Sequence, residues 1–377
     1  MNSSMIIKNI YVLMLPILKK LKNTTIFLAP ILYLFPGCQV MAETQPNYTI
    51  DIYRTKQITV EMIKARFGKD MQSLSEIMIS QDSMSSPENM RLVSNIFERT
   101  ISGLNEMGEF AYINISPTMY PQDKIIHISF DIVDKTDEQR LNVFLKKPSK
   151  SFHDPDQLIF KMLEYEKMGH ALFYKDKKPP TFKVCPAFHC LFGFDHPALQ
   201  SYKALFNTKV PKNKSRLIAI LREDKDENRR AAAAFLMAHI HDGNELIKIL
   251  SPSIYDSSNI VRNNVMRVIA ETTSKVEIKD FPIDDVIRAL DFPAASDRNK
   301  ALFLIFSVIK QLGYESYVIQ HAGKYLIEEL KLLQPNAHDF AYSILKEVSG
   351  ENYDKRDYKA WEKWVTLKGQ SLDSRNK

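Results

Sequence analysis

Glycine, cysteine and tryptophan are all scarce in this chain. Of its 377 residues, 11 are glycine, 3 are cysteine and 2 are tryptophan. So few glycines leave little scope for the tight turns of phosphate-binding loops and nucleophile elbows, and neither motif occurs, nor does the HExxH zinc motif. No Ser-His-Asp or Cys-His-Asn arrangement can be recognised either. The sequence therefore gives no support to catalysis, and no cofactor is expected.

The first 42 residues have the features of a secretory signal peptide. Three lysines precede an apolar run at residues 26–35, and a small residue, Ala42, ends the segment. The run is about 10 residues long, too short to span a bilayer, which needs roughly 20. We expect cleavage between Ala42 and Glu43 and export to the periplasm or the extracellular space. The alternatives are a lipid anchor on Cys38, as in a lipoprotein, or an uncleaved signal that holds the chain in the membrane.

The net charge of the mature chain argues against a nucleic-acid partner. The whole chain has a formal net charge of +6, but residues 1–42 contain four lysines and no acidic residue, so their removal lowers the charge to +2. Proteins that bind nucleic acids usually carry a strong positive field. We therefore expect no nucleic-acid binding.

Residues 48–136 have the pattern of a small α+β domain. In the first segment Ile50 and Ile52 alternate with polar residues, which predicts a strand with one buried face. Apolar residues three or four apart then predict two helices. The predicted elements are a strand at 48–54, a helix at 60–79, a helix from the turn at 85–87 to Gly108, and strands at 110–116 and 125–133.

This β-α-α-β-β order resembles the POTRA domain of bacterial envelope proteins. The resemblance also rests on the sequence Gly-Glu-Phe-Ala-Tyr at 108–112 and on the apolar alternation at 126–133. It covers about a quarter of the chain. It implies that the domain binds other chains by adding a strand to the edge of its sheet.

Residues 137–196 are interpreted as a connector that contains the two remaining cysteines. Cys185 and Cys190 lie close together in an exported chain, which favours a disulfide bond, with free buried thiols as an alternative. His189 and His196 flank the second cysteine. A zinc site built from Cys185, His189, Cys190 and His196 stays open as a further alternative, although the spacing matches no usual zinc motif.

Residues 197–368 repeat a pattern of two helices joined by a short turn. Aligned positions recur about 32 to 40 residues apart, within the range of helical repeats. An arginine or its equivalent opens each second helix, and a small apolar residue follows it. The aligned positions are Arg230, Arg262, Arg298 and His338, followed by Ala233, Val265, Ala301 and Ala341. The pattern resembles HEAT and, more distantly, armadillo repeats, which implies an all-α solenoid that binds proteins. Residues 369–377 are expected to be a disordered tail.

A further histidine pair is a candidate metal site. His239 and His241 are close enough to chelate a metal in an extended segment, but they more readily end a helix that Gly243 caps. Together these features predict an exported, non-catalytic scaffold that binds partner proteins, with an α+β domain followed by an α-solenoid. The alternative is a metal- or thiol-dependent enzyme that uses Cys185, His189, Cys190 and His196.

Overall fold

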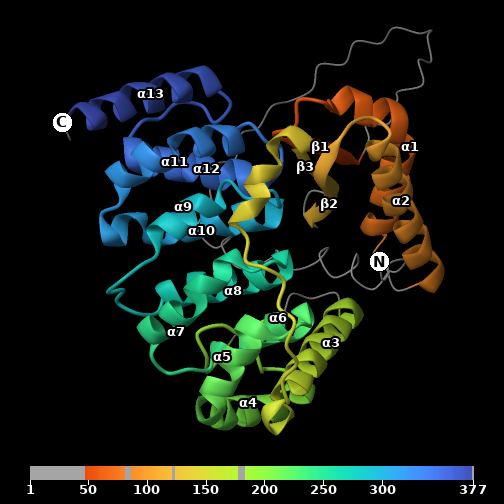
Figure 1. The fold of residues 1–377 in the computed structure, drawn as a ribbon, viewed down its shortest axis with the longest axis vertical. Helices are drawn as coiled ribbons and strands as arrows, with labels where there is room; N and C mark the ends of the chain where they lie inside the picture. Colours follow the sequence, from red (N-terminus) through yellow and green to blue (C-terminus); the bar gives the residue numbers. More distant parts are fainter. Residues whose placement is uncertain (1–46, 81–85, 121–123, 177–182, 376–377) are drawn as a thin grey trace, which may run out of the picture.

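The structure is a computed structural model that describes residues 47–80, 86–120, 124–176 and 183–375. Within these residues, a small three-stranded mixed sheet with two helices lies on the N-terminal side, and the rest of the chain is mainly helical (Figure 1). An α+β part followed by a helical region is the arrangement that the sequence predicts. The expected signal peptide, its cleavage site at Ala42 and Glu43, and Cys38 lie outside the described residues.

The α+β part has the predicted order of elements. Strand β3 is central, parallel to β1 and antiparallel to β2. The elements are β1 (Tyr48–Tyr53), α1 (Val60–Ile79), α2 (Pro87–Asn105), β2 (Phe110–Tyr120) and β3 (Ile125–Asp134). Both β2 and β3 extend beyond the predicted strands.

Helices α1 and α2 cover one face of the sheet. Thr59 caps α1, where its side chain accepts a hydrogen bond from the backbone N–H of Met62. Side chains three or four apart on α1 point into a common apolar core with β3, as the spacing predicts. The core residues of these two elements include Ile63, Phe67, Met71, Leu74, Ile126, Ile128 and Phe130. On α2, Val93 is buried, whereas Leu92 is exposed.

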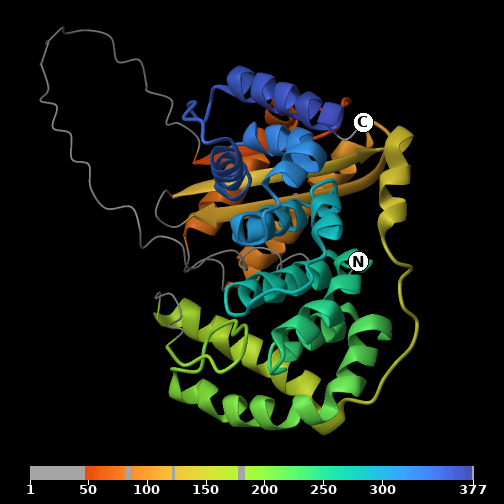
Figure 2. The same cartoon turned by 90° about the vertical axis from the view of Figure 1, so that its left-hand side faces the viewer.

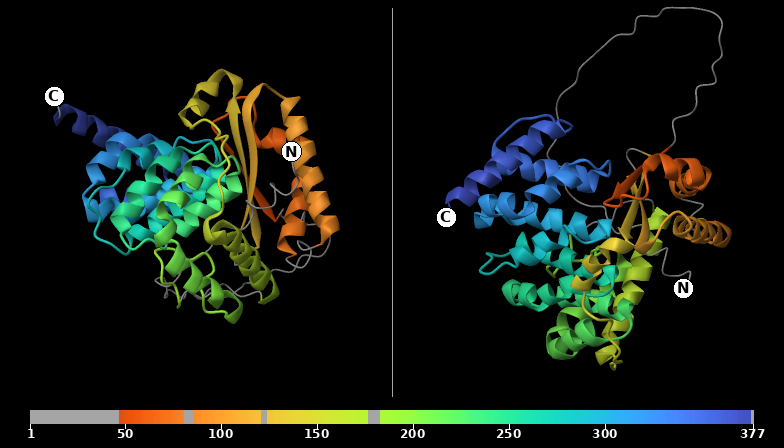
Figure 3. Two further views of the ribbon diagram at one scale, coloured as in Figure 1. Left: turned by 60° about the horizontal axis from the view of Figure 1, so that its bottom comes forward. Right: turned by 45° about the horizontal axis from the view of Figure 1, so that its top comes forward.

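The second face of the sheet is also buried, contrary to the prediction of a half-buried strand. Asp51, Tyr53, His127 and Asp131 alternate with the apolar core residues, yet each is at most 7% exposed. Figure 3 shows the reason, because the sheet stands between its two helices on one side and the helical region on the other. The side chains alternate along the strands as predicted, but the polar face of the sheet packs against protein instead of water.

The segment after β3 follows the helical region along its length. A 3-10 segment, η3 (Lys135–Val143), leads into residues 144–153, which we call the strap, and then into η4 (Pro155–Gln157) (Figures 1 and 2). The strap passes the helices in reverse chain order. The backbone N–H of Leu145 donates a hydrogen bond to the Tyr255 carbonyl at 2.8 Å. Further along, the N–H of Lys225 donates to the Lys150 carbonyl at 2.6 Å.

The helical region begins earlier than the sequence analysis placed it. Helix α3 (Leu158–Asp176) packs on α4 (Pro197–Lys209) and on α6 (Glu227–Met237). Residues 137–196 are therefore not a connector throughout, because α3 belongs to the helical packing. Residues 171–174 are part of this helix.

From α5 onward the helices alternate between two layers (Figure 1). Helices α6, α8, α10 and α12 pack on one another in chain order, and we call them the inner layer. The further elements are η5 (Pro211–Asn213), α5 (Lys214–Glu223), α7 (Gly243–Leu250), η6 (Ser251–Tyr255), α8 (Asn259–Thr273), α9 (Ile283–Ala289), α10 (Ala295–Leu312), α11 (Glu315–Leu330), α12 (Pro335–Ser349) and α13 (Tyr358–Arg375). Residues 369–375 are helical, whereas the sequence analysis expected a disordered tail there.

A buried arginine stands near the start of three inner-layer helices. Each one donates hydrogen bonds to an acidic side chain further along the chain and to a backbone carbonyl that precedes its own helix. The ion pairs are Arg230–Asp256 at 2.8 Å, Arg262–Asp297 at 2.7 Å and Arg298–Glu329 at 2.7 Å, and the carbonyls are those of Asp224, Asp256 and Phe292. We call this series the arginine ladder. At the equivalent position of α12, His338 Nδ1 lies 2.6 Å from the Leu330 carbonyl.

The small residues that the sequence aligns with this ladder are all at the centre of the packing. Each is fully buried: Ala233, Val265, Ala301 and Ala341. The same type of ion pair thus recurs at the start of three successive inner-layer helices.

Candidate binding surface

The sheet joins the helical region by capping two of its helices. The N-cap residues of α10 and α12 make no side-chain capping bond of their own. Instead, Asp131 of β3 accepts a hydrogen bond from the Ala295 N–H at 2.9 Å, and Asp51 of β1 accepts bonds from Leu333 and Gln334 at 2.8 Å each. Carboxylates are favoured at helix N-termini, where free N–H groups and the helix dipole meet them. The polar face of the sheet is therefore built to receive these two helices.

Arg298 links this junction to the arginine ladder. Its guanidinium contacts Asp131 at 3.2 Å as well as Glu329, and it lies 3.5 Å from the ring centroid of Tyr53. Two buried carboxylates thus share one arginine. Burial raises the pKa of Glu329 to about 6, in spite of the opposing effect of Arg298, and burial raises the pKa of Asp131 as well. The α+β part and the helical region are held together by ionic contacts that water does not reach.

The strap covers the edge of the helical region where the ladder arginines lie. The Phe144 ring is 4.1 Å from the Arg262 guanidinium and packs edge-on against Phe292 at 4.9 Å. Further along, Arg229 donates to the Phe152 carbonyl at 2.7 Å. This edge is therefore occupied by the chain itself.

The two cysteines lie at disulfide distance, as the sequence analysis favoured. The Cys185 and Cys190 sulfur atoms are 2.08 Å apart. Backbone hydrogen bonds from Phe188 to the Ala238 carbonyl at 2.9 Å, and from Phe194 to the Val184 carbonyl at 3.0 Å, hold the loop around them. The loop is thereby fixed against the end of α6.

The structure does not assemble the four residues considered for zinc. The exposed His196 caps α4, where its Nδ1 accepts a bond from the Ala198 N–H at 3.2 Å. His189 instead packs against Phe235 of α6, with 5.3 Å between the rings. Among the described residues, no three His, Cys, Asp or Glu side chains are grouped so that they can hold a metal ion.

The second histidine pair also differs from the expectation. Helix α6 ends at Met237, and Gly243 begins α7 behind the N-cap Asp242, so it does not cap the preceding helix. His239 is 4% exposed, and its Nδ1 lies 2.7 Å from Asn207 Oδ1. Burial lowers the pKa of His239 to about 4. This histidine is a neutral core residue.

A patch of aromatic side chains lies on the inner layer. The Phe340 ring of α12 is 5.5 Å from that of Phe303 and 6.0 Å from that of Phe306, both on α10. Phe306 is 36% exposed. We call Phe303, Phe306 and Phe340 the aromatic patch. The sequence analysis missed it because its residues come from two helices that the tertiary fold brings together.

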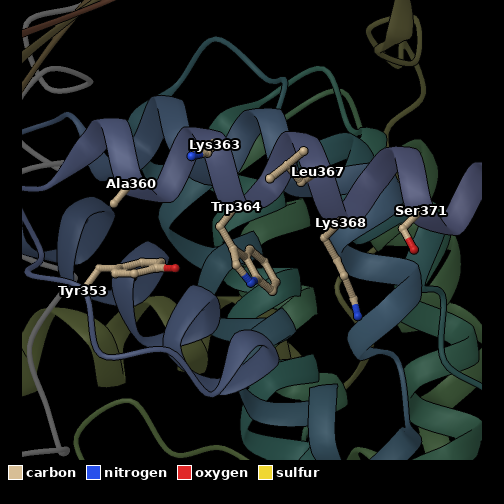
Figure 4. A pocket seen from close by; sticks show the side chains of 7 residues that line it. All are labelled: Tyr353, Ala360, Lys363, Trp364, Leu367, Lys368 and Ser371. Atoms are coloured by element: carbon tan, nitrogen blue, oxygen red, sulfur yellow. The ribbon is translucent and has the colours of Figure 1, made fainter.

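An apolar depression lies along helix α13. The depression has a volume of about 320 Å³, and Figure 4 shows the tryptophan and tyrosine rings beneath α13. Its lining residues are Tyr353, Ala360, Lys363, Trp364, Leu367, Lys368 and Ser371. Trp361 of the same helix is fully buried and donates to the Asp354 carbonyl at 3.1 Å, so α13 is firmly packed beside it.

Comparisons with families of proteins, with curated proteins and with solved structures find no match for this chain. Within the part of the chain that the structure describes, no helix is both long and apolar enough to cross a membrane.

Proposed function

We propose that this protein is an exported, non-catalytic scaffold whose HEAT-like helical array binds a partner protein. The main support is the arginine ladder, which repeats the same contact between successive helix pairs, as a solenoid does. Solenoids present extended surfaces of stacked helices to their partners. The aromatic patch is the part of this surface that offers a partly exposed apolar anchor.

The α+β part, which we take to be POTRA-like, supplies a second contact site. Strands β1 and β2 are the two edges of the sheet, and in the described part of the chain no further strand pairs with either. An unpaired edge accepts an extended segment of another chain through backbone hydrogen bonds. Because β1 and β3 are fixed to α12 and α10 by Asp51 and Asp131, the sheet and the helical surface hold one relative position.

Export is part of the proposal. The segment 1–42 resembles a signal peptide, and a close cysteine pair at disulfide distance suits an oxidising compartment. N-terminal sequencing of the exported protein should find Glu43 first. A lipid-modified Cys38 would instead identify a lipoprotein.

Site-specific crosslinking tests the binding function. A photoreactive phenylalanine analogue replaces Phe306 in the aromatic patch or, as the control, Phe160 on α3, which is 54% exposed. In the native cell we expect one protein adduct from position 306 and none from position 160. Adducts from both positions alike, or from neither, contradict a specific surface at the inner layer.

A metal measurement distinguishes the scaffold from the enzyme alternative. Stoichiometric zinc in the purified protein would favour an enzyme that uses Cys185, His189, Cys190 and His196. Absence of zinc, together with an intact disulfide, supports the scaffold.

A further inference from the structure

Helix α13 is fixed to the fold by a stripe of contacts on one side. Trp361 is fully buried, and its ring meets that of Tyr353 edge-on at 5.1 Å. One turn further along, Val365 lies over Gly323 of α11, where an added Cβ would come within 2.6 Å of the valine Cγ1. These two positions are four residues apart and share one face of the helix. That face is sufficient to hold α13 on α11.

A second apolar stripe on α13 lines the depression. Ala360, Trp364 and Leu367 recur three or four residues apart, so they lie on one face of the helix. Leu367 is 57% exposed, and Trp364 is half-buried. A helix that ends a helical stack ordinarily shows a polar outer face to water, because no further helix covers it. Packing within the chain therefore does not explain an exposed leucine beside a tryptophan.

Two lysines stand beside this stripe. Lys363 and Lys368 both line the depression and are both exposed, and in Figure 4 Lys368 points off α13 on the same side as Trp364. Across the described residues, no ion pair or hydrogen bond holds either ammonium group, and no acidic residue lines the depression. Glu362, next to Lys363 in the sequence, pairs with Lys331 instead. The rim thus carries two positive charges that no described carboxylate balances.

The charge of the rim and the shape of the depression limit what can cover it. In a two-fold dimer through this face, the lysines of one copy would meet those of the other, and like charges repel. A membrane surface suits apolar side chains that project outward, whereas the rings of Tyr353 and Trp364 lie beneath α13. The volume of about 320 Å³ is at the low end for small-molecule sites, about 300–1,000 Å³. A polypeptide segment with an apolar side chain between acidic ones matches both the size and the charge.

We propose that the α13 depression binds an acidic segment of a partner polypeptide. One apolar or aromatic side chain of the segment enters the hollow beside Trp364, and carboxylates on either side of it pair with Lys363 and Lys368. Exposed ion pairs contribute modestly, so the apolar contact supplies most of the affinity and the lysines supply the preference for acidic segments. The aromatic patch lies on α10 and α12, so this is a separate site that does not require the inner layer to bind a partner.

Tryptophan fluorescence reports directly on this site. The chain contains 2 tryptophans, and both belong to α13. The probe is the peptide Glu-Asp-Leu-Phe-Asp-Glu, acetylated and amidated at its ends, and the comparison peptide is Gln-Asn-Leu-Phe-Asn-Gln. With the full mature chain at low salt, the acidic peptide should shift the emission to shorter wavelength and bind about tenfold more tightly than the neutral one. This preference should disappear at about 1 M salt, where exposed charges are screened.

Two double variants that remove the same net charge separate the rim from the charge of the whole protein. Lys363→Gln/Lys368→Gln should abolish the preference for the acidic peptide, whereas Lys248→Gln/Lys310→Gln, which changes exposed residues of α7 and α10, should keep it. Leu367→Ser should weaken the binding of both peptides alike, because it removes an apolar contact and no charge. All five side chains are exposed, so each variant should melt close to the wild type.

Equal binding of the two peptides, or a preference that survives Lys363→Gln/Lys368→Gln, would overturn the proposal. Loss of the preference in Lys248→Gln/Lys310→Gln would overturn it too, because the charge of the whole protein would then be its cause.

Two further measurements cover the other occupants. An emission shift with phosphatidylserine vesicles but with neither peptide would overturn the proposal in favour of a membrane surface. A dimer in sedimentation velocity that Leu367→Ser dissociates, without peptide binding, would overturn it in favour of a second copy. All these assays use purified protein, so a failure of crosslinking at position 306 in the cell bears on the scaffold function alone.

Discussion

Replacing Arg262 with methionine tests how much the arginine ladder contributes to stability. Arg262 donates two hydrogen bonds to one oxygen of Asp297, at 2.9 and 2.7 Å, and a third to the Asp256 carbonyl at 2.7 Å. Arg262 and Asp297 are 4% and 0% exposed at their side chains. Methionine fills part of the volume but leaves Asp297 buried without its counter-charge. Removal of one partner of such a pair costs about 3–5 kcal/mol.

The double variant Arg262→Met/Asp297→Leu separates the ion pair from the packing around it. With both charges gone, the main loss is the donor to the Asp256 carbonyl, which costs about 1–3 kcal/mol. The double variant should therefore be more stable than Arg262→Met alone. Urea denaturation of the mature chain, monitored by circular dichroism, measures each free energy of unfolding. The comparison requires the same m-value in every variant. A loss below about 1 kcal/mol for Arg262→Met, or a double variant less stable than the single one, would refute the reasoning.

Three further predictions concern the junction, the array and the loop. Because the pKa of Glu329 is raised from 4.5 to about 6, its protonated form stabilises the fold below pH 4.5, and this contribution is lost as the pH rises through 6. Glu329→Gln should therefore gain about 2 kcal/mol relative to the wild type over that rise, which urea titrations at several pH values will measure. Ala301→Asp should cost about 3 kcal/mol or more, because the charge is fully buried without a partner, whereas the exposed Gln311→Asp control should melt close to the wild type. The Cys185–Cys190 bond closes only a short loop, so its reduction should cost about 2–3 kcal/mol, a prediction that an unchanged urea midpoint in reducing agent would contradict.

Local elements could be predicted because their causes are local. The spacing of Ile63, Phe67 and Met71 predicts a helix with one apolar face, and the alternation around Ile50 predicts a strand. The recurring arginines could be aligned for a similar reason, since each helix pair meets the same packing problem and places the same residue type there.

The aromatic patch could not have been predicted in this way. Phe303 and Phe306 lie on α10, and Phe340 lies on α12. Their rings meet because α10 and α12 pack on one another, and that packing joins segments that are separate in the sequence.

By itself, the sequence determined the helices and strands of the α+β part and the helical character of the region that follows it. These properties follow from the order of apolar and polar residues within one or two turns. Only the tertiary structure decided what covers the polar face of the sheet, because the partners of Asp51 and Asp131 lie at Gln334 and Ala295, far along the chain. The residues next to a carboxylate in a strand do not indicate whether it will face water or the N–H groups at the start of a helix. That choice is made by long-range packing, where burial, helix capping and the shared Arg298 act together.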